Sequence, residues 1–225
     1  MSLYLFINLA SISIPFLYSF EKKMHFIQYW KEVFSAITIT GFIFIVWDVI
    51  FTSLGVWGFN DTYLLGINIG NLPIEEWLFF ICIPYASIFT HYALRHFFPN
   101  LVLNSVVTKG FTVTLIIILS IIIILNVNKL YPFYNFGFLL LILVYSLITN
   151  NQQLQPFYIS FLVILIPFFV VNGVLTGSFI EDQVVWYNNK ENLGVRLGTI
   201  PVEDIGYAFS MIFFSIILIE KFKRR

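Results

Sequence analysis

Long apolar stretches constrain this chain more than any other feature of its sequence. A helix needs about 20 mainly apolar residues to cross the hydrocarbon core of a bilayer. Seven stretches meet or approach that length, and the fifth is the shortest, so six spans are the alternative to seven. The stretches are Leu3–Phe20, Val33–Leu54, Pro73–Leu94, Val102–Leu125, Phe133–Thr149, Phe157–Leu175 and Pro201–Ile219.

The scarcity of charge supports the same class of protein. Charged residues make up 11% of the 225 residues, and the mean hydropathy is +0.89. Soluble domains carry roughly a quarter charged residues, so this chain cannot cover a water-facing surface. This excludes a soluble enzyme, a nucleic-acid-binding protein and a disordered tail. We therefore expect an all-α integral membrane protein in a lipid bilayer, and its single cysteine, Cys82, allows no intrachain disulfide.

Basic residues predict the orientation. With seven spans, nine of the twelve Lys and Arg residues fall on one side, and the positive-inside rule places that side in the cytoplasm. The N-terminus is then outside, and we expect the bacterial inner (cytoplasmic) membrane. The nine are Lys22, Lys23, Lys31, Arg95, Lys109, Lys221, Lys223, Arg224 and Arg225. Nine acidic residues belong to the outer half instead, and topology does not explain that clustering.

An internal repeat accounts for several of these acids. At an offset of 128 residues, Leu-Gly, six residues and Pro-Ile-Glu-Glu recurs as Leu-Gly, six residues and Pro-Val-Glu-Asp. After a slip of four residues, Asp48 falls on Asn172. The other matched pairs are Asn60 and Asn188, Leu65 and Leu193, Gly66 and Gly194, Gly70 and Gly198, Pro73 and Pro201, Glu75 and Glu203, Glu76 and Asp204, Phe44 and Phe168, and Thr52 and Thr176.

The repeat predicts the organisation of the chain. Residues 1–100 and 131–225 each form three helices, and residues 101–130 form a linker helix. Helices three and seven cross in the same direction, so the two repeats are parallel and both acidic motifs lie at the outer face. A pseudo-twofold arrangement would bring these motifs to one cavity.

Each paired acid follows a proline that suits the first position of a helix. One interpretation is structural, because acids in a first turn are favoured by the helix dipole or sit among lipid headgroups. Two motifs in register favour function, since ionisable residues at the edge of the hydrocarbon are costly. Carboxyls transfer protons, and one of a pair acts as acid while the other acts as base. Candidate catalytic residues are Glu75, Glu76, Glu203 and Asp204.

Other chemistry finds little support. No Cys/His cluster has metal-ligand spacing, and no dinucleotide or phosphate-binding motif occurs, so we expect no metal and no cofactor. We expect His25 and His96 in loops and His91 at a helix end, each with a structural role. The 44 aromatic residues could stabilise a carbocation, although most of them suit bilayer packing, and Trp57 and Trp186 suit an interfacial belt.

The acidic motifs and their surroundings resemble a known family. Trp47-Asp48, Trp57-Gly58-Phe59-Asn60, Tyr63-Leu64-Leu65-Gly66 and the run from Pro73 to Phe80 are similar to the first domain of membrane-integral lycopene cyclases. Trp186-Tyr187-Asn188, Leu193-Gly194-Val195-Arg196 and Pro201-Val202-Glu203-Asp204 are similar to the second domain. The family occurs as two small subunits or as a fused chain. The resemblance covers nearly the whole chain, and Asn172 in place of a second aspartate puts an equal role for both halves in doubt.

The resemblance implies a lycopene β-cyclase, an intramolecular lyase (isomerase) of carotenoid synthesis. Its reaction is redox-neutral acid/base cyclisation of one or both ends of lycopene, giving γ- or β-carotene. The substrate is lycopene or another linear carotenoid, and association with other carotenoid enzymes fits such a pathway. The resemblance also implies that the four paired acids carry out catalysis. The residues expected to bind substrate are Asp48, Trp57, Asn60, Phe79, Asn172, Trp186, Asn188, Arg196 and Tyr207.

Other functions stay open at this point. A proton- or cation-coupled transporter would suit parallel repeats, although no broken helix pair is evident at mid-membrane. A retinal protein is set aside because the stretch Pro201–Ile219 contains no lysine. An ε-cyclase or a one-end cyclase would use the same acid and a different final proton loss, and a hydratase would instead trap the cation with water.

Overall fold

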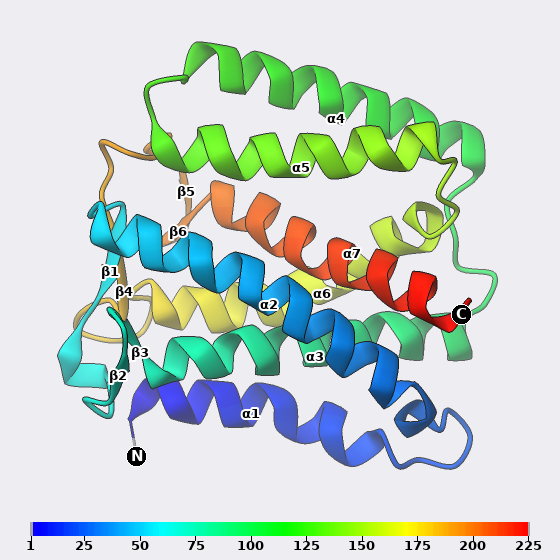
Figure 1. Cartoon of the computed structure of the whole chain (residues 1–225), viewed down its shortest axis with the longest axis horizontal. Coiled ribbons are helices and arrows are strands. Elements are labelled where there is room, and N and C mark those ends of the chain that lie inside the picture. The colour runs from blue at the N-terminus through cyan, green and yellow to red at the C-terminus, as the bar shows by residue number, and fades with distance from the viewer. Residues whose placement is uncertain (1, 225) are drawn as a thin grey trace.

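The computed structural model describes residues 2–224, which form an elongated bundle of helices with short strands at one end (Figure 1). Arg225 lies outside the described residues. The helices are α1 (Leu3–Tyr18), α2 (Trp30–Ser53), α3 (Ile74–Phe97), α4 (Ser105–Leu125), α5 (Leu130–Ile148), α6 (Leu154–Leu175) and α7 (Glu203–Lys223), with short 3-10 helices at Phe26–Tyr29 and Asp61–Tyr63.

The prediction of an all-α membrane protein is confirmed. Among the described residues, six helices are long and apolar enough to cross a membrane, and α1 is an apolar helix of 16 residues. The prediction that the fifth helix is the shortest is wrong. Helix α5 begins at Leu130 rather than Phe133 because Pro132 lies in its first turn, where a missing N–H costs nothing.

The helices that carry the acidic motifs begin at the same end of the bundle. Figure 1 shows that α1, α3, α5 and α7 all start at the end where the strands lie, and that α2 and α6 finish there. Helix α1 packs along α3, and α5 packs along α7. Helix α4 lies at the edge of the bundle, mainly against α5. The assignment of residues 1–100, 101–130 and 131–225 as two repeats and a linker stays a prediction.

A tight hairpin precedes each motif. Strands β2 (Asn68–Ile69) and β3 (Leu72–Pro73) pair before α3, and β5 (Arg196–Leu197) and β6 (Ile200–Pro201) pair before α7. Gly70 and Gly198 have φ values of 67° and 64° at the turns, a region that glycine enters without steric cost. The prolines therefore end strands, and the prediction that they begin helices is wrong by one or two positions.

A third strand pair joins the two halves. Strand β1 (Trp57–Phe59) pairs antiparallel with β4 (Val185–Tyr187). Trp57 lies opposite Tyr187, and Phe59 lies opposite Val185. Since Trp57 and Phe59 correspond to Val185 and Tyr187 at the repeat offset of 128, exchanging the halves leaves this register unchanged. The strand pair thus has the twofold relation that the repeat predicted.

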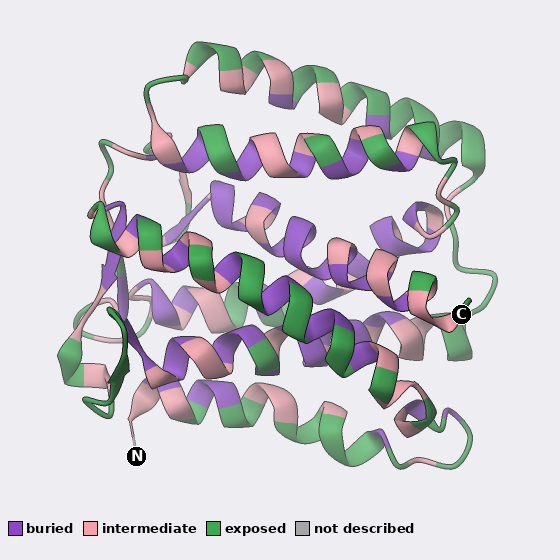
Figure 2. Cartoon of the chain, viewed as in Figure 1, coloured by how far each residue is buried: buried purple, intermediate pink, exposed green. Residues whose placement is uncertain are grey.

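Burial follows the interior faces of the bundle, whereas α4 and the outer faces of α1, α2 and α5 carry much of the exposed apolar surface (Figure 2). One core cluster runs through α3, α5, α6 and α7, where Phe157 and Phe213 stack with ring centroids 4.7 Å apart. A second cluster surrounds the strands and includes Phe44, Trp57 and Tyr131.

Some local predictions differ from the structure. His91 is inside α3, buried, and hydrogen-bonded to Ser160 at 2.8 Å, and His96 is in the last turn of α3 rather than in a loop. Trp57 is buried and is not part of an interfacial belt, because its indole reaches inward from β1. His25 is in a loop, and Cys82 is buried, as expected for a packing role.

Replacing Gly58 with alanine should destabilise the protein. A Cβ there would lie 2.3 Å from Cζ2 of Trp186, and relieving such an overlap costs about 1–3 kcal/mol. Gly110→Ala is the matched control, because Gly110 lies in α4 and a methyl group added there would meet nothing within 4 Å. Thermal unfolding of both variants in the same detergent checks this, and equal unfolding temperatures would contradict it.

Candidate active site

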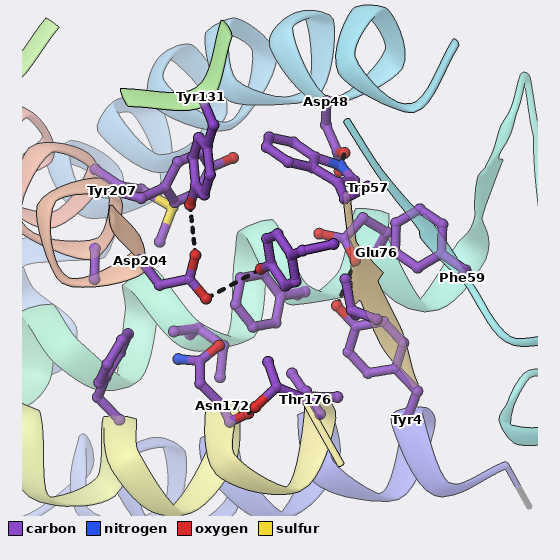
Figure 3. Close-up of a pocket in the computed structure, with 18 residues that line it drawn as sticks. Tyr4, Asp48, Trp57, Phe59, Glu76, Tyr131, Asn172, Thr176, Asp204 and Tyr207 are labelled. Atoms are coloured by element: carbon purple, nitrogen blue, oxygen red, sulfur yellow. Dashed lines mark hydrogen bonds between the residues drawn. The ribbon is translucent and has the colours of Figure 1, made fainter. Parts of the chain in front are cut away.

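A small cavity lies between the helices next to the strand pair β1–β4 (Figure 3). Its volume is about 70 Å³. Residues from both halves of the chain line it, and three of them carry carboxyl groups. The lining residues are Tyr4, Asp48, Trp57, Phe59, Glu76, Phe79, Ile83, Tyr131, Phe168, Asn172, Leu175, Thr176, Val185, Tyr187, Asp204, Tyr207, Ala208 and Met211.

The second acid of each motif lines the cavity. Glu76 and Asp204 are both buried. Tyr4 of α1 donates a hydrogen bond to Glu76, and Tyr131 of α5 donates one to Asp204 at 2.5 Å. Tyr4 and Tyr131 hold equivalent places on the first helix of each half. Each motif acid is therefore held by a phenol from the neighbouring helix.

The first acid of each motif points elsewhere. Glu75 accepts a hydrogen bond from the backbone N–H of Leu65 at 2.7 Å, and Glu203 accepts one from Leu193 at 2.6 Å. These bonds tie each helix start to the loop before it. Neither Glu75 nor Glu203 lines the cavity. In each pair, one carboxyl fastens the loop and the other faces the cavity.

A matching contact strengthens each helix start. Asn8 donates a side-chain hydrogen bond to the carbonyl of Glu75 at 2.8 Å, and Asn135 donates one to the carbonyl of Glu203 at 2.6 Å. Both asparagines are buried. They lie one helical turn after Tyr4 and Tyr131, so a Tyr-x-x-x-Asn pattern on the first helix of each half docks against the acidic motif.

A third carboxyl comes from α2. Trp57 donates its indole N–H to Asp48, and Thr52 donates to the same oxygen at 3.3 Å. Asp48 and Glu76 line the same cavity. Asn172 of α6 lies at the corresponding place in the second half and lines the cavity (Figure 3). The first half thus brings two carboxyls together where the second half has one carboxyl and an amide.

Asp204 has a second phenol partner. Tyr187, in strand β4 outside the helices, donates to the other oxygen of Asp204 at 3.0 Å. Burial, followed by the nearby charge of Asp204, raises the pKa of Tyr187 well above its ordinary value. Tyr187 therefore keeps its proton and acts as a neutral donor.

Aromatic rings close the cavity on several sides. Tyr207 packs edge-on against Phe44 with centroids 4.8 Å apart and against Trp47 at 5.3 Å. Trp57 packs against Phe51 at 4.9 Å and against Tyr131 at 5.1 Å. Ring faces attract cations, more strongly where water is excluded. Within residues 2–224, no group of three or more His, Cys, Asp or Glu residues could hold a metal ion.

Comparison with known proteins places this site in a family. The family model described as lycopene cyclase matches residues 1–94 and 128–222. The chain belongs to the lycopene cyclase family. The family resemblance found in the sequence is thereby confirmed, and membership supports a membrane enzyme of the lycopene cyclase type that acts on a carotenoid. Searches of curated proteins and of solved structures found no significant match.

Seven of the thirteen residues singled out from the sequence line the cavity. These are Asp48, Trp57, Glu76, Phe79, Asn172, Asp204 and Tyr207. Besides Glu75 and Glu203, four others do not line it. Asn60 and Asn188 accept hydrogen bonds from the loop backbone, Arg196 bonds the carbonyl of Thr199 at 2.6 Å, and Trp186 is half-exposed over Gly58.

Sequence reasoning missed the three tyrosines that hold the carboxyls. Tyr4 and Tyr131 share the spacing to Asn8 and Asn135, and an offset of 127 residues relates both pairs. Extending the repeat to the first helix of each half would have found them. Tyr187 had no such signal, because its counterpart in the first half is Phe59.

The carboxylates of Glu75 and Glu203 should matter for stability. Glu203→Ala leaves the backbone N–H of Leu193 without its acceptor, and a buried donor left unpaired costs about 1–3 kcal/mol. Glu203→Gln keeps an acceptor oxygen and should lose less. Thermal unfolding in detergent, together with faster hydrogen exchange around Leu193, measures the effect. Unfolding temperatures for the alanine variant equal to wild type would refute the loop-fastening role.

Proposed function

We propose that this protein cyclises the acyclic ends of lycopene to β-ionone rings, an intramolecular lyase (isomerase) reaction that yields γ- or β-carotene. One observation carries the proposal: three buried carboxyls from both halves of the chain, Asp48, Glu76 and Asp204, surround one aromatic-walled cavity. The reaction needs a proton donor, a proton acceptor and a dry site, and it changes no oxidation state.

The chemistry proceeds by proton addition and proton loss. A carboxylic acid adds a proton to the terminal double bond of the polyene, which leaves a tertiary cation. The double bond four carbons away attacks that cation and closes a six-membered ring. A carboxylate then removes a proton next to the new cation, and the ring double bond forms. One proton enters and one leaves, so the product is an isomer of the substrate.

The walls of the cavity suit the cationic stages. Trp57, Phe79 and Tyr207 present rings to the cavity, and a desolvated cation over a ring gains about 2 kcal/mol. Excluding water also prevents water from capturing the cation, which would give a hydrated product instead of a ring.

In this proposal the small size of the cavity requires the substrate to move side chains. An apolar cavity of about 150 Å³ takes up benzene, whereas this one has about 70 Å³. One six-membered ring therefore fits only after lining side chains move outward. Only an end of the polyene can enter, and the rest of the chain lies among the helices or in the lipid.

The ring type follows from the proton that the base removes. Loss from the ring carbon that joins the polyene gives the β ring, and loss from the opposite neighbour gives the ε ring. We propose the β product, in line with the family resemblance, and product analysis distinguishes the two.

Expression in bacteria that accumulate lycopene tests this function. The wild-type protein should convert lycopene to products with β rings, and Glu76→Gln and Asp204→Asn should each lower conversion about 100-fold or more, the usual contribution of a general acid or base. Matched controls are Glu181→Gln and Asp61→Asn, which alter exposed acids outside the cavity. Pigments are separated by chromatography, and membrane levels are compared by immunoblot.

Unchanged lycopene in cells with wild-type protein in their membranes would reject the function. Wild-type conversion by both site variants would reject the assignment of these carboxyls.

We also propose that the N-terminus and the strand-bearing end face the outside of the cytoplasmic membrane. The basic residues between helices gather at the opposite end. In a Cys82→Ser background, Asp61→Cys should react with a membrane-impermeant maleimide in spheroplasts, whereas Lys22→Cys should react only after permeabilisation. Both positions lie in loops outside the long helices. The reverse labelling pattern would invert the orientation.

A further inference from the structure

The two halves of the active site differ in ways that divide the proton chemistry between them. We propose that Glu76, sharing a proton with Asp48, donates the proton that starts cyclisation, and that Asp204 is the carboxylate that removes the final proton. This assignment rests on the proposed cyclase function and deepens it, since it gives each half of the repeat a separate role.

The first difference is the side chain on the second helix of each half. Asp48 and Glu76 of the first half line the cavity together, whereas the counterpart of Asp48 beside Asp204 in the second half is Asn172. Two adjacent carboxyls away from water do not both ionise, because like charges repel strongly there. An amide neighbour imposes no such repulsion. The first half is therefore built to retain a proton, and the second half is not.

An unpaired oxygen supports the shared proton. Oδ1 of Asp48 accepts from Trp57 and Thr52, but Oδ2 is buried and has no hydrogen-bond donor within residues 2–224. Buried polar atoms rarely lack a partner. In this proposal a proton held between Glu76 and Asp48, which line the same cavity, supplies the missing donor.

The second difference is in the strand pair. Tyr187 donates to Asp204, and its counterpart beside Glu76 is Phe59, which has no hydroxyl. Asp204 thus receives hydrogen bonds on both oxygens, from Tyr131 at 2.5 Å and from Tyr187 at 3.0 Å. Donors to both oxygens favour the ionised carboxylate. Both differences favour a proton on Glu76 and an ionised carboxylate at Asp204.

The remaining charged and titratable neighbours do not reverse this pattern. Tyr207 lines the cavity with all three carboxyls, and Tyr4 donates to Glu76. Glu203 accepts from the backbone N–H of Leu193 and Arg196 donates to the carbonyl of Thr199, so within residues 2–224 neither hydrogen-bonds to Asp204. None of these groups gives Glu76 a cation or gives Asp204 a second carboxyl on the facing helix.

The cycle closes without an added reactant. Glu76 gives its proton to the terminal alkene carbon, the ring forms, and Asp204 takes a proton from the ring. The proton then returns from Asp204 to the Asp48–Glu76 pair. Tyr187 hydrogen-bonds to Asp204 and lines the same cavity as Glu76, and in this cycle its hydroxyl passes on its own proton while it accepts another.

Deuterium labelling distinguishes donor from acceptor. Membranes with each variant are incubated with lycopene in D₂O, and the pigments are analysed by mass spectrometry. The wild type should place one deuterium in each new ring. Asp204→Asn keeps the donor, so recovered lycopene should carry deuterium at its terminal double bond, or rings should form with the double bond displaced. Glu76→Gln should return lycopene with no more label than membranes without the protein.

A second pair of variants tests the difference between the halves. Asp48→Asn removes the partner that shares the proton, and Asn172→Asp gives Asp204 a carboxyl neighbour. Each should lower turnover at least about tenfold, and labelling of lycopene without ring formation should appear only in Asn172→Asp. Asp61→Asn serves as the control, and thermal unfolding confirms that every variant compared is folded.

The outcomes separate this inference from the proposed function. Absence of ring products from the wild type rejects the function itself. If the wild type cyclises and label appears in lycopene with Glu76→Gln but not with Asp204→Asn, the roles are reversed. If neither variant labels lycopene and Asp204→Asn forms no rings with a displaced double bond, or if both variants label lycopene, the division of labour is wrong while the cyclase function stands.

Discussion

Ionisable groups buried in an apolar helix bundle need hydrogen-bond partners, and this requirement organises the structure. An unpaired carboxyl in such surroundings is costly. Here each motif acid is met by a donor from another segment: backbone N–H groups for Glu75 and Glu203, and phenols for Glu76 and Asp204. The packing of α1 on α3 and of α5 on α7 provides the phenols. The same contacts that stabilise the helix starts therefore set the positions of the carboxyls that line the cavity.

Duplication explains how so many carboxyls reach one place. Each half alone supplies a helix that begins with an acidic pair and a first helix with the tyrosine and asparagine that hold it. Joining the halves through β1 and β4 turns two similar ends towards each other across one cavity. Once both halves face the same substrate, their side chains are free to diverge. Asn172 opposite Asp48, and Tyr187 opposite Phe59, are the places where they have done so.

The sequence predicted much of this arrangement because the signals are local or repeated. Apolar length predicted the helices, and the recurring Pro-x-acid-acid pattern predicted that Glu76 and Asp204 approach one cavity. The pattern does not predict which acid of each pair faces the cavity. Successive residues on a helix are turned by about 100°, so the answer depends on the neighbours of α3 and α7. Arg196 and Asn188 lie outside the cavity for a related reason: their side chains bond to loop segments near the motif.

The symmetric register of the β1–β4 pair has a consequence for chain connectivity. Helix α4 supplies none of the residues that line the cavity, and the family match omits residues 95–127, which contain it. The two halves contact each other through strands β1 and β4, whose pairing register is unchanged when the halves are exchanged. The lining of the cavity therefore comes entirely from the two matched segments, and the linker joins them without contributing to it.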